Sequence, residues 1–212
     1  MQKKLMAKRS KPTSHWRQRH RKDSYMEKAT REGWRSRAVY KLQQIHTRDR
    51  LFRSGIRCVD LGASPGSWSQ FASKLIGPNG RLWAVDKQPM EPITGVDFFL
   101  GDFTDPETIS FLRSALGDDS IDLVMSDMSP NISGNRAVDQ PRAMGLAEDA
   151  LAFALETLGE GGDFLTKLFQ GEGFEGFVGC IKQSFESVKI IKPRASRPES
   201  REVYLLARTY RM

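Results

Sequence analysis

The sequence is poor in cysteine and histidine, the side chains that most often carry redox or metal chemistry. Its two cysteines, Cys58 and Cys180, form no C-x-x-C pair, and none of the three histidines stands at metal-ligand spacing from them. Cys58 also begins an apolar, strand-like run, which favours a small core residue. We therefore predict neither a redox centre nor a metal site.

Long hydrophobic runs are missing as well. No apolar stretch approaches the roughly 20 residues that a membrane-spanning helix needs. The basic N-terminus lacks the apolar segment of a secretory signal. We accordingly expect a cytoplasmic protein that does not associate with membranes.

Positive charge is plentiful but unevenly distributed. Residues 1–53 hold 17 Lys or Arg against four Asp or Glu, whereas the remaining 159 residues carry a net charge of −6. A basic arm on a mildly acidic body suggests that the arm binds a polyanion, although a solvated, solubilising tail has the same composition. Residues 1–22 have almost no apolar periodicity, so we expect them to be disordered without a partner.

Residues 23–212 are expected to form one domain, which begins with a helical extension at 23–53. Beyond it, strands and helices alternate. Strands are predicted near 57–61, 81–86, 97–100, 121–126, 163–169, 187–192 and 202–208, and helices near 67–76, 106–116, 139–158 and 173–184. The alternation predicts an α/β fold, a doubly wound and mostly parallel sheet with helices on both faces.

The most informative stretch is the turn at 62–66, Gly-Ala-Ser-Pro-Gly, which joins the first strand to a helix. This order places backbone N–H groups and a helix N-terminus beside a bound ligand. A dinucleotide-binding turn would read G-x-G-x-x-G, which this turn does not. Asp86 ends the next strand, where a carboxylate can bind ribose hydroxyls, and Asp102 follows the third strand. Carboxylates without a phosphate-binding basic residue favour a nucleoside with a positive centre, and S-adenosylmethionine fits that description.

Two later strands carry groups suited to chemistry. Asp127 follows the strand at 121–126, and ligands of doubly wound sheets bind outside the carboxyl ends of the strands. Lys167 is embedded in the apolar strand at 163–169, an unusual place for lysine unless it projects from the sheet end or is paired. Taken alone, Lys167 would be interpreted as a surface lysine at a strand end.

Six blocks in order make residues 24–208 resemble the FtsJ family of ribosomal RNA 2′-O-ribose methyltransferases. The blocks are Arg35-Ser36-Arg37-Ala38 with Lys41-Leu42, Val59-Asp60-Leu61-Gly62-Ala63 with Pro65-Gly66 and Trp68-Ser69-Gln70, Gly95-Val96-Asp97-Phe98 with Gly101-Asp102-Phe103, Ser126-Asp127-Met128 with Pro130-Asn131, Lys167 with Phe169-Gln170-Gly171, and Ser200-Arg201-Glu202-Val203-Tyr204. The resemblance implies a Rossmann-like methyltransferase fold with a seven-stranded sheet and S-adenosylmethionine as methyl donor. The implied acceptor is a uridine ribose of large-subunit ribosomal RNA, on an assembled or late-assembling subunit. We expect a monomer.

The resemblance also assigns the site. The family's catalytic tetrad falls on Lys41, Asp127, Lys167 and Glu202. Its cofactor contacts fall on Gly66, Trp68, Asp86, Asp102 and Asp127. Trp68 can also be interpreted as a core anchor for its helix, whereas the resemblance favours a cofactor contact through its backbone. Glu202 is preferred to Glu199 because it directly precedes the apolar run at 203–207.

The tetrad suits the expected reaction. A ribose 2′-hydroxyl is a weak acid, so a base must remove its proton during the in-line displacement at the methyl group. We assign Lys167 as that base and Lys41 as a neighbouring cation that favours its neutral form. Asp127 acts in the opposite direction, because a nearby carboxylate favours the charged ammonium. The alternative, that Lys167 only orients the hydroxyl and the proton leaves late, stays open.

RNA contacts and the exact substrate are less constrained. The candidates for RNA contacts are the basic arm, Arg35, Arg37, Arg142, Arg197 and Arg201, and a structural ion pair is an equal alternative for each arginine. Two other functions stay open. One is the same chemistry on tRNA or an mRNA cap, and the other is a non-catalytic RNA-binding assembly factor on the same scaffold.

Overall fold

The computed structural model describes residues 23–118 and 120–211, so the expectation of a disordered arm at 1–22 lies outside the described residues. The described chain runs in the order α2 (Ser24–Arg31), α3 (Val39–Asp49), β1 (Arg57–Leu61), α4 (Ser67–Ile76), β2 (Arg81–Asp86), β3 (Asp97–Leu100), α5 (Pro106–Leu116), β4 (Ile121–Ser126), α6 (Arg136–Thr157), β5 (Leu158–Phe169), α7 (Phe174–Ser184), β6 (Phe185–Ile191) and β7 (Glu202–Tyr210). The predicted alternation of strands and helices is thereby confirmed.

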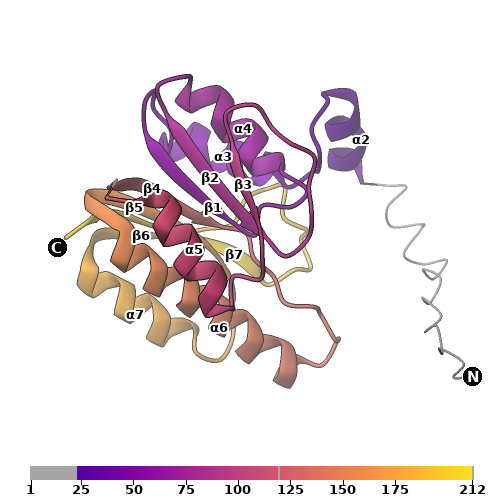
Figure 1. Ribbon diagram of the computed structural model, residues 1–212. Helices are drawn as coiled ribbons and strands as arrows, with labels where there is room; N and C mark the ends of the chain where they lie inside the picture. Colours follow the sequence, from indigo (N-terminus) through magenta and orange to yellow (C-terminus); the bar gives the residue numbers. More distant parts are fainter. Residues whose placement is uncertain (1–22, 119, 212) are drawn as a thin grey trace, which may run out of the picture.

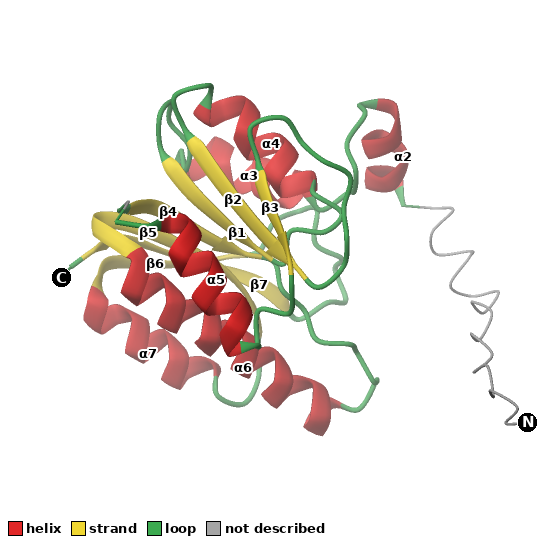
Figure 2. Ribbon diagram, viewed as in Figure 1, coloured by secondary structure: helices red, strands yellow, loops and turns green. Residues whose placement is uncertain are grey.

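The strands form one seven-stranded sheet in the order β3-β2-β1-β4-β5-β7-β6 (Figure 2). Strands β1 to β5 pair in parallel, whereas β7 lies antiparallel between β5 and β6. The chain order reverses between β1 and β4, and such a reversal opens a crevice at the carboxyl ends of the two strands. The α/β, Rossmann-like class predicted from the sequence is therefore confirmed.

Helices cover both faces of the sheet (Figure 1). On one face, α3 and α4 contribute Leu42, Ile45 and Ala72 to an apolar cluster with the strands. On the other face, α5, α6 and α7 contribute a larger cluster that includes Phe153 and Phe177. Because both faces are covered, the central strands carry unbroken apolar runs, and four of the five β1 residues are buried.

Helix α3 places Lys41 at the rim of the sheet. The sequence suggests that Ser36 caps this helix, but the helix begins later, at Val39, with Ala38 as its N-cap. The Ser36 hydroxyl instead accepts a bond from the backbone N–H of Ala38 at 3.2 Å and lies 2.8 Å from the Ser67 hydroxyl of α4. Since Leu42 and Ile45 face the sheet, Lys41 lies beside the buried stripe, where its long side chain can reach the strand ends.

No helix of the described residues is long and apolar enough to cross a membrane.

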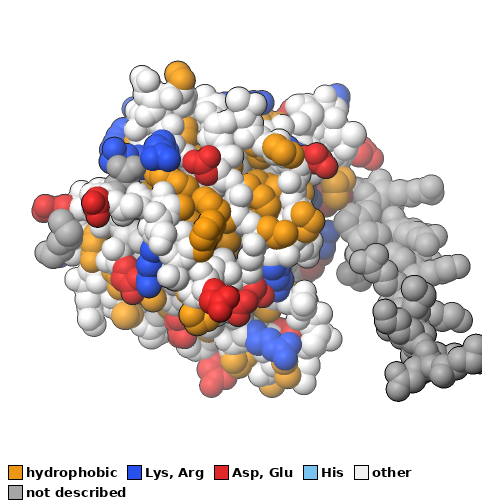
Figure 3. Space-filling model, viewed as in Figure 1, with side chains coloured by type: hydrophobic (Ala, Val, Ile, Leu, Met, Phe, Trp, Pro, Cys, Tyr) orange, Lys and Arg blue, Asp and Glu red, His pale blue; other side chains and the backbone are white. Residues whose placement is uncertain are grey.

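An apolar patch lies on the surface outside the crevice. On the face shown in Figure 3, apolar side chains gather over β3 and α5, where Leu100 and Phe111 are 64% and 61% exposed. The edge strand β3, which is four residues long, is therefore flanked by apolar surface.

Candidate active site

The glycine turn after β1 uses most of its backbone donors internally. The N–H groups of Gly62 and Ala63 both donate to the carbonyl of Val85, at 2.9 and 3.1 Å. The N–H of Ser64 donates to Asp86 Oδ2 at 2.9 Å. Donors that are already paired cannot bind a pyrophosphate, so the expectation of a turn whose N–H groups face the ligand is wrong for these three. The turn binds to β2 instead, and this fixes the Asp86 carboxylate.

A cavity of about 220 Å³ opens at this turn, and carboxylates from three strand ends line it: Asp86, Asp102 and Asp127. Asp86 accepts a second bond from the N–H of Gln88 at 2.8 Å. Asp102 accepts bonds from the N–H and hydroxyl of Thr104, and these bonds hold the pKa of its carboxyl below the usual value. The structure therefore brings three of the predicted cofactor residues together.

The cavity wall also contains a lysine that sequence reasoning missed. Lys87 lines the cavity, and its Nζ lies 3.8 Å from Asp102 Oδ2. The expectation that no basic side chain stands here is therefore wrong. Lys87 directly follows Asp86 at the end of β2, so its position at the rim could have been found from the strand pattern. Its charge is paired with Asp102, and the other two carboxylates keep the wall acidic.

Gly66 and Trp68 do not line the cavity. The indole of Trp68 is buried against the Tyr204 ring, with ring centroids 5.7 Å apart, and its Nε1 donates to the Ala38 carbonyl at 3.0 Å. A Cβ on Gly66 would lie 2.9 Å from side-chain atoms of Arg35, Met90 and Ile93. The core-anchor interpretation describes the Trp68 side chain, and cofactor contacts of both residues stay predictions.

Gly62 is the glycine that the cavity requires. Its φ is +80°, and a Cβ there would lie 2.7 Å from Met128 Cγ and 3.0 Å from Met128 Cα. Met128 directly follows Asp127 and lines the same cavity. The absence of a side chain at Gly62 thus lets the β1 and β4 loops approach each other at the crevice.

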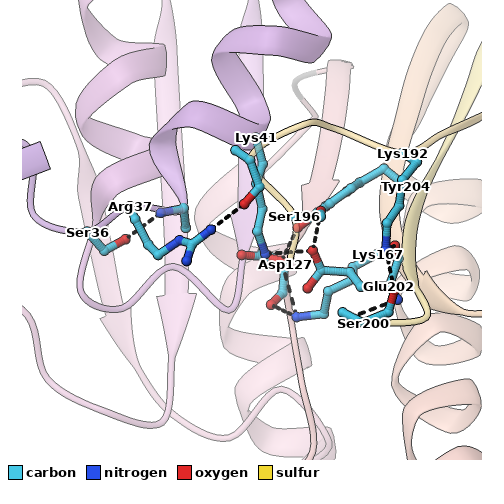
Figure 4. A network of polar contacts seen from close by, with 12 residues as sticks. Ser36, Arg37, Lys41, Asp127, Lys167, Lys192, Ser196, Ser200, Glu202 and Tyr204 are labelled. Carbon is cyan, nitrogen blue, oxygen red and sulfur yellow. Dashed lines mark hydrogen bonds and ion pairs between the residues drawn. The ribbon is translucent and has the colours of Figure 1, made fainter. Parts of the chain in front are cut away.

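The four tetrad residues meet at the rim of this crevice, beside the cavity wall formed by Asp127. Lys167 Nζ lies 3.1 Å from Asp127 Oδ1 and donates to the Asp127 carbonyl at 2.6 Å. Lys41 Nζ lies 2.7 Å from Glu202 Oε1. Figure 4 shows the four side chains pointing toward one another from α3, the end of β4, β5 and β7. Two lysine–carboxylate pairs therefore share one small, largely buried space.

Tyr204 completes this network and was not predicted. Its ring is fully buried, and its hydroxyl donates to Asp127 Oδ1 at 2.7 Å. Burial opposes the charge of Asp127, but the ammonium groups of Lys167 and Lys41 and the Tyr204 hydroxyl together hold its pKa below the usual value. Asp127 is thus a carboxylate at neutral pH. Tyr204 stands two residues after Glu202 on β7, and side chains with this spacing share a face.

Glu202 is the glutamate that faces the tetrad. Besides Lys41, its Oε1 accepts a bond from the Ser196 hydroxyl at 2.8 Å. Its backbone N–H donates to the Ser200 hydroxyl at 3.1 Å, and its carbonyl accepts from Lys192 Nζ at 2.7 Å. Glu199 is exposed and lines a different hollow. The structure therefore supports the choice of Glu202 over Glu199.

A second buried carboxyl lies beneath the glycine turn. Asp60 is completely buried, and its Oδ2 accepts a bond from the Ser69 hydroxyl at 2.6 Å. Its Oδ1 has no partner among the described residues. Burial raises the pKa of Asp60 to about 7, and the charges of Asp127 and Asp86 act in the same direction. Below about pH 7, Asp60 is therefore mostly protonated, whereas Asp127 remains ionised over most of that range.

Arg35 binds protein rather than solvent. Its guanidinium donates to the carbonyls of Pro65 at 3.2 Å, Glu91 at 2.6 Å and Pro92 at 2.9 Å. These bonds fasten the loop after β2 to the glycine turn. Arg35 therefore positions two loops beside the cavity through bonds to carbonyl groups, and RNA contact by Arg35 stays a prediction.

The other four arginine candidates differ in how much of the side chain is bound to protein. Arg37 is largely buried, pairs with Asp23 and donates to the Ala195 carbonyl. Arg201 donates to the Gln170 carbonyl at 2.9 Å. Arg142 and Arg197 are exposed. RNA contact stays a prediction for all five of these arginines.

No metal centre accompanies these groups. The part of the chain that the structure describes contains no cluster of three or more His, Cys, Asp or Glu side chains that could hold a metal ion. Cys58 is buried and Cys180 is exposed, each as a free thiol.

Comparison with known proteins identifies the family of the chain. The pattern of the FtsJ-like methyltransferases matches residues 34–210. The chain is 51% identical over 199 residues to ribosomal RNA large subunit methyltransferase E of Azoarcus sp. (strain BH72), covering 94% of this chain and 97% of that protein.

Solved structures agree. The fold matches that of a candidate ribosomal RNA methyltransferase of Plasmodium falciparum with a TM-score of 0.75 and 26% identity, over 84% of this chain and 98% of that one. A candidate rRNA methylase of Clostridium thermocellum matches with a TM-score of 0.52 and 18% identity, over 80% of this chain and 97% of that one, which shows the fold alone. With its tetrad at the crevice and this match across most of its length, the chain belongs to the FtsJ-like methyltransferase family.

Proposed function

We propose that this methyltransferase transfers a methyl group from S-adenosylmethionine to the 2′-hydroxyl of a uridine in large-subunit ribosomal RNA, on an assembled or late-assembling subunit. The observation that carries the proposal is the meeting of two lysine–carboxylate pairs, Lys167 with Asp127 and Lys41 with Glu202, beside the acidic cavity. The relative from Azoarcus, a ribosomal RNA large subunit methyltransferase, supports the substrate class. A cytoplasmic location and a monomeric state remain part of the proposal.

The cavity suits a nucleoside that carries positive charge. Asp86 has both carboxylate oxygens oriented by backbone N–H groups, which prepares them to accept the hydroxyls of a ribose. The turn offers no unpaired N–H from Gly62, Ala63 or Ser64 for a phosphate. When bound, S-adenosylmethionine would supply an electrophilic methyl group on a positively charged sulfur. Asp86, Asp102 and Asp127 are the residues that would hold it.

The tetrad would prepare the acceptor hydroxyl. In our proposal Lys167 acts in its neutral amine form: it takes the hydroxyl proton as the oxygen attacks, and it thereby becomes the ammonium that pairs with Asp127. Asp127, held as a carboxylate by its bonds to Lys167 and Tyr204, fixes the Lys167 nitrogen in place. Lys41, fixed by Glu202, lies close enough to Asp127 to lower its pKa, and its charge stabilises the developing alkoxide. Burial strengthens each of these interactions, because the dielectric is low there.

Lys167→Ala tests this assignment. We expect the substitution to abolish methyl transfer. Donor affinity, measured by calorimetry, should stay within about twofold of the wild type; for comparison, a tenfold change in affinity would correspond to about 1.4 kcal/mol. Lys182→Ala, on the exposed side of α7, is the control for loss of one lysine. Near-normal turnover of Lys167→Ala would show that Lys167 is not the base.

The substrate is tested separately. We expect labelled methyl to appear in large ribosomal subunits from cells that lack the protein, at a ribose 2′-oxygen that is unmodified only in those cells. Parallel reactions contain tRNA and capped mRNA. Transfer to either of these, without transfer to the ribosomal subunit, would refute the proposed substrate and leave the proposed chemistry intact.

A further inference from the structure

A second hollow, of about 250 Å³, lies next to the tetrad. It is lined by residues from the β4–α6 loop, the start of α6, the end of β5 and the segment before β7: Ile132, Gly134, Arg136, Asp139, Gln140, Phe169, Glu199 and Arg201. It shares no lining residue with the acidic cavity. At about 250 Å³ it is smaller than the 300–1,000 Å³ of most drug-sized ligand sites. Its size therefore suits one small planar group.

Strand register connects this hollow directly to the tetrad. Phe169 pairs across the sheet with Glu202, and Lys167 pairs with Tyr204. Side chains opposite each other in an antiparallel pair have Cβ atoms about 4.5–5.5 Å apart. Arg201 also precedes Glu202 in the chain. A group seated in the hollow would thus be an immediate neighbour of whatever the tetrad holds.

The walls combine two cations with apolar surface and one exposed carboxylate, Glu199. Arg136 is exposed at the first position of α6, and Arg201 uses one nitrogen for the Gln170 carbonyl. Ile132 is 62% exposed although it is large and apolar, and Phe169 is half-buried. Arginine binds phosphate, and apolar or aromatic surface receives an unstacked base, which is the combination that binds single-stranded RNA.

The hollow is built before any ligand arrives. Asp139 accepts bonds from the N–H and hydroxyl of Ser133, both at 2.8 Å, and from the N–H of Gly134 at 3.0 Å. These bonds order the loop that carries Ile132 and occupy the carboxylate of Asp139. On the opposite side, Gln140 Nε2 donates to the Phe169 carbonyl and to that of Glu172, both at 3.0 Å. Both walls are therefore fixed by hydrogen bonds, which are exposed in the loop and partly buried at Gln140.

We propose that this hollow binds the nucleotide adjacent to the methylated ribose, with its phosphate between Arg136 and Arg201 and its base against Ile132 and Phe169. The inference rests on the proposed RNA methylation. It adds that the enzyme grips the strand at a second position, and that this grip aligns the target hydroxyl with Lys167.

The test measures methylation of large ribosomal subunits by Arg136→Ala, Arg136→Lys and Ile132→Ser, each against the wild type. Arg113→Ala is the matched control, because Arg113 pairs with Glu156 on a distant hollow. We expect Arg136→Ala to raise the KM for the subunit about tenfold and to lower the slope of log affinity against log salt by about one. Arg136→Lys should keep the salt slope of the wild type. Ile132→Ser should raise the KM for the subunit and leave the salt slope unchanged. Donor affinity should not move in any variant.

The outcomes separate the two proposals. If the wild type methylates the subunit while Arg136→Ala and Ile132→Ser keep its KM and salt slope, the second grip is refuted and the proposed function stands. If the wild type methylates another RNA instead, the same variants are measured on that RNA with the same criteria. If the wild type transfers methyl to no RNA, both proposals are refuted.

Discussion

Asp60→Asn should change how the stability of the protein depends on pH. Asp60 is completely buried, and its pKa is raised from 3.8 to about 7. Between these two values the folded protein keeps a proton on Asp60 that the unfolded chain has released. Folding therefore takes up a proton in this range, and stability must fall as pH rises. Asparagine has the same shape and cannot titrate.

The size of the effect follows from the shift. One pKa unit corresponds to about 1.36 kcal/mol. Integrating the linkage from pH 4 to pH 7, with the two pKa values above, we expect the wild type to lose about 3 kcal/mol of stability relative to Asp60→Asn. Asp127→Asn should behave oppositely. The pKa of Asp127 is lowered, so the stability that its charge contributes is present above about pH 4 and is lost as pH falls through the folded pKa.

Urea unfolding at pH 4, 5, 6 and 7 measures the difference for Asp60→Asn, and the same measurement extended below pH 4 measures the difference for Asp127→Asn. Each variant is compared with the wild type at the same pH, so titration of all other groups cancels to first order. Parallel curves for the wild type and Asp60→Asn across this range would refute the reasoning, because they would mean that Asp60 titrates alike in the folded and unfolded chains.

Three further predictions concern the loops and the tetrad. Gly62→Ala should lower the free energy of unfolding by more than about 1–2 kcal/mol, the usual penalty of the left-handed region, because the new Cβ would also clash with Met128. Gly95→Ala is the control: with φ +78° and no atom within 4 Å of the new Cβ, it adds the backbone strain without a clash. Equal urea-unfolding costs for these two variants would contradict the clash. Arg35→Met should weaken donor binding in calorimetry and leave the salt slope of RNA binding unchanged, because Arg35 holds loop carbonyls; a slope lowered by about one would instead indicate a phosphate contact. Tyr204→Phe should lower the free energy of unfolding by about 1.5–3 kcal/mol, the range for a hydrogen bond to a charged group, and an unchanged value would mean that the Asp127 contact is weak.

Parallel-strand geometry explains which parts of the site were predictable. Asp86 ends a strand of the parallel part of the sheet and Asp102 and Asp127 follow two others, so a linear pattern already places them at one edge. Trp68 was harder to interpret, because the orientation of its ring depends on how α3 packs against α4. Tyr204 gave no distinct signal, since a tyrosine in an apolar strand is common whether or not its hydroxyl meets a buried carboxylate.

Element boundaries show a similar limit. Pro141 suggests that α6 begins near residue 139, because proline favours the first turn of a helix. The helix begins earlier, at Arg136, because the Asn135 side chain accepts a bond from the N–H of Ala137 at 3.1 Å and caps it. The insertion of β7 between β5 and β6 was also not predicted. It depends on pairing between distant segments, which hydrophobic periodicity does not encode.

The position of β7 has a consequence for synthesis of the protein. β7 is the last strand of the described chain, yet it lies inside the sheet and carries both Glu202 and Tyr204. A ribosome adds about 5–20 residues per second from the N-terminus. A nascent chain therefore contains Lys41, Asp127 and Lys167 before Glu202, the partner of Lys41, and Tyr204, the hydroxyl donor to Asp127, have been made, and β5 still has an unpaired edge. In the proposed mechanism, the tetrad is complete only when β7 has been made and has inserted between β5 and β6.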